Sequence, residues 1–265
     1  TDLLFVIDSD GVMGIYTDQA QTVLGAFVDT LRQSNVDLQA AVIHHGDSCP
    51  QTSPSYTTSD DPASDVLELL QDGFSAPSGW GSNALGEHAA SALEHDSPGD
   101  CMDGFLREGA QLHIVMVAGA ADMSSQSPEA QISALRALAP DASEIRISVL
   151  VPVTSEACSG VTLGEGYMDL AADTDGAIED LCLDDWSGPF QAFADVSVSA
   201  QEGELIHPLA SSPIVESIEV TAGGIQIEDW SWEEELGAVR FYENSSITPG
   251  EWATIRYVAA LECAE

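Results

Sequence analysis

Four short, mainly apolar runs constrain the fold of this chain more than any other feature. They occupy residues 3–7, 40–43, 112–117 and 147–151. An apolar run of strand length without polar alternation is typical of a parallel strand that is buried on both faces. The segments between the runs carry apolar residues at helical spacing, as in Val23, Phe27 and Leu31. This alternation predicts an α/β fold: a Rossmann-like, mostly parallel sheet with helices on both faces.

The helical segments have recognisable signals of their own. Ser127 followed by Pro128 predicts a helix start, with the serine as N-cap and the proline at the first helical position. The alanine-rich segment 85–93 and the segments 167–172 and 186–194 are also expected to be helical.

The character of the sequence changes near residue 197. Beyond it, helical periodicity disappears and short strand-like runs follow one another at residues 218–221, 225–227, 238–242 and 253–258. A glycine pair at 223–224 separates the first two runs and indicates a hairpin. We therefore predict two domains, an α/β domain over 1–196 and a small antiparallel β-sandwich-like domain over 197–265, packed on the first.

The charge balance excludes several classes of function. Of the 265 residues, 45 are acidic and 6 are basic, which gives a formal net charge of −39, and the six basic residues are all arginine. Binding of nucleic acid or of an anionic membrane surface needs a basic patch, which this sequence lacks. A hydrophobic content of 44% also excludes a disordered acidic tail. A solvated acidic surface, suited to a salty medium, is the simplest interpretation of the charge.

The five cysteines favour an oxidising compartment. Cys158 can pair with Cys182, and Cys49 with Cys101, whereas Cys263 is left over as a free thiol or an interchain link. Five reduced, buried thiols are the alternative.

No signal peptide precedes the first strand, so we expect a mature or trimmed chain. We expect it outside the cell or at the cell surface, and the periplasm and the outer membrane are the alternative locations.

Motifs for enzymatic chemistry are missing. The sequence has no G-x-S-x-G elbow and no H-E-x-x-H pair. A glycosidase-type carboxylate pair has no recognisable motif among 45 acidic residues, so motifs do not exclude a hydrolase, which stays the least favoured alternative. Trp230 and Trp232 fall on one strand face and are expected in the core of the small domain. We therefore expect a protein that is not an enzyme.

The loop after the first strand reads Asp8-Ser9-Asp10-Gly11-Val12-Met13-Gly14. Further short motifs follow in order: Gly104-Phe105-Leu106-Arg107 before the central strand, then Asp122 and Ser124, Cys158, Gly166-Tyr167, Cys182 and Asp185-Trp186. In their order and spacing the sequence resembles the von Willebrand factor A family, in its bacterial secreted and lipoprotein branch. The resemblance covers most of the chain and implies the fold predicted above, with an appended β unit.

The resemblance also implies a metal-ion-dependent adhesion site for Mg²⁺ or a similar cation such as Ca²⁺, but the family's ligands are incompletely matched. Asp8 fits the family pattern, whereas Asp10 and Val12 stand where serines are expected. Ser82 is the best candidate for a ligand from the second loop, and Gly119 stands where an aspartate is expected in the third. These departures imply a degenerate site without metal.

A rebuilt cation site is the alternative. Asp122 lies a few residues beyond Gly119 and, with Asp8, Asp10 and Asp47, could supply carboxylates to one ion. Carboxylates near one edge repel one another unless a cation or a proton lies between them.

We therefore expect a non-enzymatic interaction or adhesion module that binds another protein, or copies of itself, at the carboxyl edge of the sheet. This edge should consist of the loops Asp8–Gly14, His44–Cys49, Trp80–Asn83 and Gly119–Ser125. Besides the residues above, it should include Ser9, Gly11, His44, His45, Asp47, Trp80 and Asn83. Adjacent histidines at a strand end point to opposite faces, so His44 and His45 are unsuited to sharing one metal. Two alternatives remain: a cation-dependent adhesin that uses the rebuilt site, and a structural subunit of a surface assembly or filament linked through Cys263.

Overall fold

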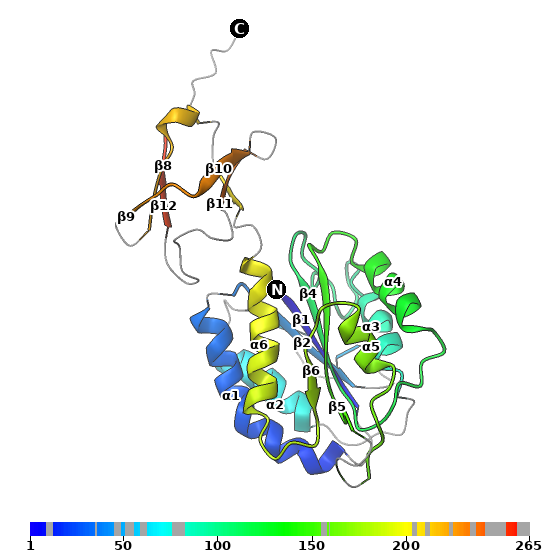
Figure 1. Ribbon diagram of the computed structural model, residues 1–265. Coiled ribbons are helices and arrows are strands. Elements are labelled where there is room, and N and C mark those ends of the chain that lie inside the picture. Colours follow the sequence, from blue (N-terminus) through cyan, green and yellow to red (C-terminus); the bar gives the residue numbers. More distant parts are fainter. Residues whose placement is uncertain are drawn as a thin grey trace. The chain divides into compact units, whose positions relative to one another are not determined.

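A computed structural model describes the chain as two compact units, Thr1–Ala200 and Gln201–Glu265 (Figure 1). The residues described are 1–8, 13–34, 36–44, 49–50, 56–58, 63–75, 83–154, 158, 160–202, 206–209, 213–222, 225–233, 237–241 and 253–258.

The first unit is built on a six-stranded sheet with the order β3-β2-β1-β4-β5-β6. All neighbouring pairs are parallel except β2 and β3, which are antiparallel. The strands are β1 (Asp2–Ile7), β2 (Gln39–His44), β3 (Tyr56–Thr58), β4 (Leu112–Val117), β5 (Ile145–Val151) and β6 (Ile178–Asp180). The predicted mostly parallel α/β fold is confirmed.

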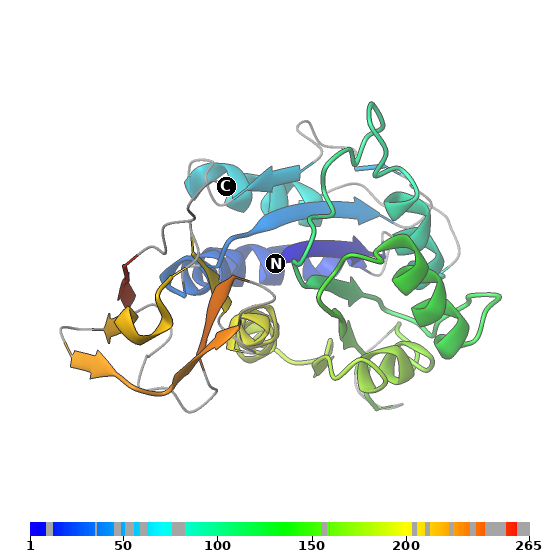
Figure 2. The same ribbon diagram turned by 90° about the horizontal axis from the view of Figure 1, so that it is seen from above.

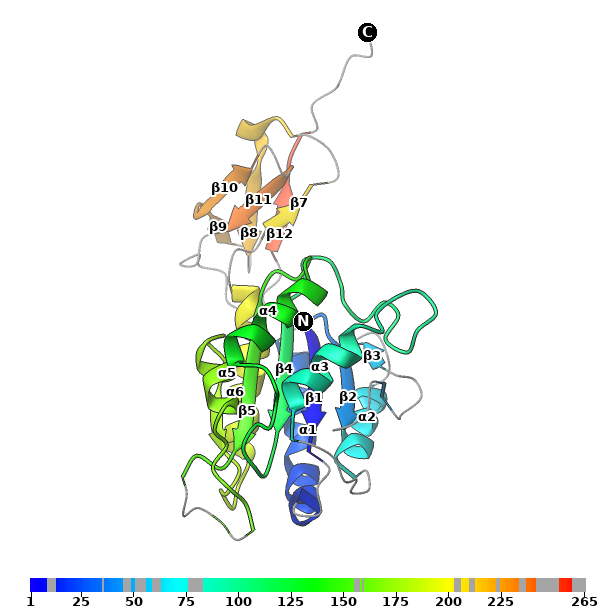
Figure 3. The same cartoon turned by 90° about the vertical axis from the view of Figure 1, so that its right-hand side faces the viewer.

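Helices cover both faces of this sheet (Figures 2 and 3). On one face lie α1 (Thr17–Gln33), α2 (Ala63–Ser75) and α6 (Ser187–Glu202), with the short 3-10 helix η1 (Met13–Tyr16) before α1. On the other face lie α3 (Leu85–Leu93), α4 (Pro128–Leu138) and α5 (Tyr167–Ala172).

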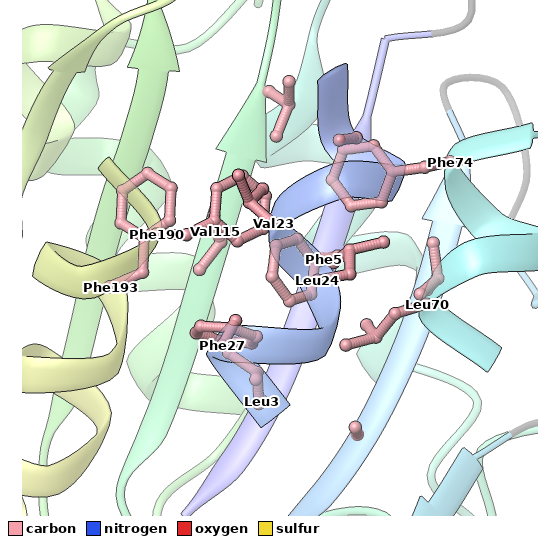
Figure 4. Packing of buried hydrophobic residues seen from close by; sticks show 14 of the residues in the cluster. Leu3, Phe5, Val23, Leu24, Phe27, Leu70, Phe74, Val115, Phe190 and Phe193 are labelled. Carbon is pink, nitrogen blue, oxygen red and sulfur yellow. The ribbon is translucent and has the colours of Figure 1, made fainter. Parts of the chain in front are cut away.

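The central strands divide their side chains between two cores. In β1, Leu3 and Phe5 point to the core under α1, α2 and α6, whereas Leu4 and Val6 point to the other. This two-residue alternation, with apolar side chains on both sides, is why residues 3–7 of β1 form an uninterrupted apolar run. Figure 4 shows the first core, in which the ring of Phe5 lies 5.9 Å from that of Phe27, 5.7 Å from that of Phe74 and 6.3 Å from that of Phe190.

The element boundaries follow the predictions closely where local signals exist. The Oγ of Ser127 accepts a hydrogen bond from the backbone N–H of Ala130 (3.4 Å), so it caps α4 as expected. Helix α6, in contrast, continues to Glu202, eight residues beyond its predicted end and through the predicted domain boundary at 197. The first unit accordingly extends to Ala200.

The second unit contains two three-stranded antiparallel sheets, with the orders β10-β11-β7 and β12-β8-β9. The elements are β7 (Ile206–Pro208), the 3-10 helix η2 (Val215–Ser217), β8 (Glu219–Ala222), β9 (Ile225–Ile227), β10 (Trp230–Glu233), β11 (Ala238–Phe241) and β12 (Ala253–Arg256). Val220 and Ile227 from one sheet share a core with Val239 and Phe241 from the other, and both Trp230 and Trp232 pack against it.

Both cysteine pairs are bonded in the structure: Cys49 to Cys101, and Cys158 to Cys182. They span 52 and 24 residues of sequence, for which loop-closure entropy gives about 3–4 kcal/mol of stabilisation each. Cys263 lies outside the described residues. Across the described ranges, no helix is both long and apolar enough to cross a membrane.

Candidate functional site

The carboxyl ends of β1, β2, β4 and β5 lie at one edge of the sheet because these strands run parallel. Backbone bonds bring three loops together at this edge. Met123 N–H donates to the carbonyl of Asn83 (2.8 Å), Asp122 N–H donates to that of Glu165 (2.9 Å), and Thr162 N–H donates to that of Gly119 (3.0 Å). The loops before α3, after β4 and before α5 therefore form one connected surface.

Asp8 stands at the end of β1 and is only 2% exposed. Its backbone N–H donates to the carbonyl of Val117 (2.8 Å), which continues the pairing of β1 with β4. Its Oδ2 accepts a hydrogen bond from the backbone N–H of Gly119 (3.3 Å). The residue where the family pattern expects a third-loop aspartate thus provides a backbone donor to Asp8 instead.

Asp122 organises the loop that follows β4. Its Oδ1 accepts hydrogen bonds from the backbone N–H of Ser124 (3.0 Å) and from the Ser124 hydroxyl (2.6 Å). Its Oδ2 accepts one from Nε2 of Gln131 in α4 (2.9 Å), which also donates to the carbonyl of Gln126 (3.2 Å). Three donors on one carboxylate fix both the turn and its attachment to α4.

A second acidic residue holds the next part of the loop. Oε1 of Glu87 in α3 accepts hydrogen bonds from both the N–H and the hydroxyl of Ser125 (2.7 Å each). The hydroxyl bond is the main reason that the pKa of Glu87 lies below its usual value. Between these two anchors Met123 is 68% exposed. Residues 122–125 therefore form a well-anchored turn that presents a large apolar side chain to solvent.

Tyr167, at the start of α5, holds the loop before α3 in place from the interior of the unit. Its ring is fully buried, and its hydroxyl donates to the carbonyl of Asn83 and accepts from the N–H of Leu85 (3.3 Å). Burial raises the pKa of Tyr167, so the hydroxyl remains a neutral donor. Gly166 precedes it at φ +84°, where a Cβ would lie 2.8 Å from that of Asp122, so this position requires glycine for both conformation and space.

Of the expected edge residues, the structure describes Asp8, His44, Asn83 and Asp122. Asn83 is buried, and within the described part of the chain its Oδ1 has no hydrogen-bond partner. The other expected edge and ligand residues lie outside the described residues: Ser9, Asp10, Gly11, Val12, His45, Asp47, Trp80 and Ser82. A ligand set for a cation at this edge stays a prediction.

His44 differs from the expectation that it belongs to the binding surface. It is only 6% exposed, and its Nε2 lies 2.7 Å from the carbonyl oxygen of Gly73 in α2. A carbonyl only accepts, so Nε2 carries the proton. The β2 register turns this side chain inward toward α2 rather than outward to a ligand, and it attaches the helix to the sheet.

A serine–histidine arrangement also occurs in the first unit, but it is inaccessible. His113 in β4 is 0% exposed, with Nε2 2.8 Å from Oγ of Ser148 and Nδ1 2.7 Å from Oγ of Ser197. The Ser197 hydroxyl donates to the carbonyl of Phe193 (3.0 Å), and Ser148 Oγ accepts from the N–H of Ala177 (3.0 Å). Ser197 must therefore accept from Nδ1–H, and the Ser148 hydroxyl donates to Nε2. This buried chain joins α6 to β4 and β5 and has no route for a substrate.

The predicted edge included the loop Gly119–Ser125, and with it Met123 and Ser125, but sequence reasoning missed Glu87 and Gln131. The contributions of Glu87 and Gln131 depend on how α3 and α4 dock, which no local pattern encodes.

Comparison with known proteins gives only distant structural likeness. No family model and no curated protein matches the chain. Among solved structures, proximal thread matrix protein 1 from the mussel byssus is similar at 12% identity, over 74% of this chain and 45% of that one, with a TM-score of 0.45. The pilus adhesin SpaC from Lactobacillus rhamnosus GG is similar at 9% identity, over 96% of this chain and 38% of that one, with a TM-score of 0.47.

A von Willebrand factor type A structure from Catenulispora acidiphila is similar at 10% identity, over 95% of this chain and 56% of that one, with a TM-score of 0.47. This chain thus spans less than two thirds of the length of each of these three proteins. Likeness at these values says nothing about what the chain binds.

Proposed function

We propose that this protein is a non-enzymatic interaction module and that another protein, or a second copy of the chain, binds at the carboxyl edge of its first unit. The observation that carries the proposal is the turn over residues 122–125, in which an exposed Met123 is held between two anchored carboxylates. The hydrogen bonds of the turn keep the Met123 side chain exposed, so this side chain adds nothing to the apolar core of the unit.

The chemistry of the turn suits a protein partner. Methionine is enriched at protein interfaces, where its flexible thioether adapts to different apolar surfaces. The turn is anchored before binding, so a partner would pay little ordering entropy to recognise it. The serines and carboxylates around Met123 would form the polar rim of such a contact.

We further propose that binding at this edge does not need a metal ion. Three protein donors already engage the carboxylate of Asp122, and Gly119 supplies a backbone N–H where a ligand is expected. The cation-dependent alternative would use Asp8 and Asp122 together with residues outside the described ranges. The two disulfides support a location outside the cell, where such bonds persist.

Site-specific photo-crosslinking tests the proposal. A photoreactive amino acid at position 123 would be compared with the same group at Glu108, which is exposed in the turn before β4, at the opposite edge of the sheet. Each protein would be illuminated alone and with extracellular proteins from its source. We expect one discrete adduct from position 123, either with a second copy or with one other protein, and none from position 108.

Met123→Asp supplies the functional counterpart, because a charge at that point should abolish partner capture without unfolding the chain. An equal adduct yield from both positions, or capture that Met123→Asp leaves unchanged, would overturn the proposal.

A further inference from the structure

A second group of chemically active side chains lies at the C-terminal end of α3, away from the turn at 122–125. Cys49 comes from the segment after β2, and His95 and Cys101 come from the turn after α3. One ligand atom from each, two sulfurs and an imidazole nitrogen, all lie within 4.8 Å of one another. Among the described residues it is the one group of three or more such side chains close enough to hold a metal ion.

Hydrogen bonds that do not involve the disulfide hold two of these residues in place. Oδ1 of Asp96 accepts from the N–H groups of Phe105 (2.8 Å) and Leu106 (3.4 Å), and Met102 N–H donates to the carbonyl of His95 (3.1 Å). Met102 and Phe105, which follow Cys101 in the chain, are fully buried. The backbone at His95 and directly after Cys101 is therefore held by bonds that remain when the Cys49–Cys101 bond opens.

We propose that the reduced form of this site binds Zn²⁺ through the sulfurs of Cys49 and Cys101 and a ring nitrogen of His95. Thiolate and imidazole are the ligands that zinc prefers, with bonds of about 2.3 Å and 2.0–2.1 Å. Tetrahedral angles then place the two sulfurs about 3.8 Å apart and each sulfur about 3.6 Å from the nitrogen. These separations fall inside the 4.8 Å within which the three atoms already lie.

The disulfide and the metal are alternative crosslinks between the same two segments. A dithiol reductant supplies two electrons and two protons, the Cys49–Cys101 bond breaks, two thiols form, and the reductant becomes a disulfide. Zn²⁺ then displaces both thiol protons. Two thiolates neutralise the charge of the ion, and a water molecule completes the coordination. Three protein ligands with one open position form a site that can exchange its fourth ligand.

The decisive experiment uses the wild-type chain, so that no variant has to fold. The protein is reduced under anaerobic conditions and then alkylated with and without Zn²⁺, and the modified cysteines are mapped by mass spectrometry. We expect Zn²⁺ to slow alkylation of Cys49 and Cys101, while Cys158 and Cys182 react at the same rate with and without it. Equal protection of all four cysteines, or of none, would overturn the proposal.

Cobalt(II) provides a spectroscopic probe of the ligands. Reduced protein should develop a thiolate-to-cobalt charge-transfer band that Zn²⁺ abolishes, and oxidised protein should not. Loss of a second-shell partner already weakens metal affinity roughly 10–100-fold, so loss of a ligand in His95→Ala should weaken it by at least as much. His88→Ala, in the helix that precedes His95, is the matched control and should leave the titration unchanged. A band of equal affinity in the His95→Ala variant would exclude histidine ligation.

Discussion

Gly25 lies in the interior of α1 and Gly86 in the first turn of α3, and a methyl group should have opposite effects at the two positions. A Cβ on Gly25 in α1 would meet nothing within 4 Å, so Gly25→Ala should raise stability by about 1 kcal/mol through helix propensity alone. A Cβ on Gly86 in α3 would lie 1.9 Å from Oε1 of Gln131 and would force that side chain to move.

Moving Gln131 breaks its bonds to Asp122 and Gln126, and a hydrogen bond to a charged group contributes roughly 1.5–3 kcal/mol. Gly86→Ala should therefore lower the free energy of unfolding by about 2 kcal/mol despite its better helix propensity. Urea denaturation of the two variants measures the contrast. A Gly86→Ala protein as stable as Gly25→Ala would show that Gln131 does not hold the turn.

At the scale of single elements, α6 is attached to the sheet by the buried chain through His113. Burial is the main cause that lowers the pKa of His113 to about 3, with a smaller contribution from the charge of Arg146. In the unfolded chain the pKa returns to about 6.5. Between these values the unfolded state binds the extra proton, so stability is present above pH 6.5 and is lost as the pH falls.

The loss should approach about 1.4 kcal/mol per pH unit below 6.5, and its test is the free energy of unfolding measured from pH 7.5 to 5.5, before most carboxylates titrate. His113→Gln keeps a donor and an acceptor but does not titrate, so it should show a flatter profile. Identical slopes in the variant and the wild type would mean that other groups cause the acid sensitivity.

Local signals account for which elements could be predicted from the sequence. The Ser127–Pro128 start and the apolar run of β4 were sufficient by themselves, and the structure gives β4 at the predicted residues 112–117. β3 was missed because three residues at an antiparallel edge leave too short a pattern to read. The proximity of His95 to the cysteines was missed for a related reason, since Cys49 reaches it only through the tertiary fold.

For the molecule as a whole, two of the six arginines, Arg107 and Arg146, form ion pairs with acidic residues of the first unit. Arg107 donates from Nε to Oδ1 of Asp2 (2.7 Å) and from its backbone N–H to Oδ2 (2.8 Å), although Asp2 is only 1% exposed. Arg146 in β5 pairs with Glu144, which immediately precedes that strand (2.9 Å). Most of the 45 acidic residues therefore lack a basic partner, and their repulsion must be screened by solvent ions.

This repulsion predicts that stability rises with salt, and the same titration can show whether a specific cation site exists. Raising NaCl from 0.01 to 1 M shortens the screening length from about 30 Å to about 3 Å. A gain of about 2 kcal/mol would raise the melting temperature by roughly 4–8 °C in a chain of this size.

MgCl₂ and CaCl₂ at matched ionic strength will also contact the acidic surface, so wild type must be compared with Asp8→Asn, which alters only the buried edge carboxylate. If the edge works without metal, the extra shift caused by the divalent ion is equal in the two proteins. An extra shift that Asp8→Asn removes would instead establish a cation site at the carboxyl edge and favour the cation-dependent adhesin.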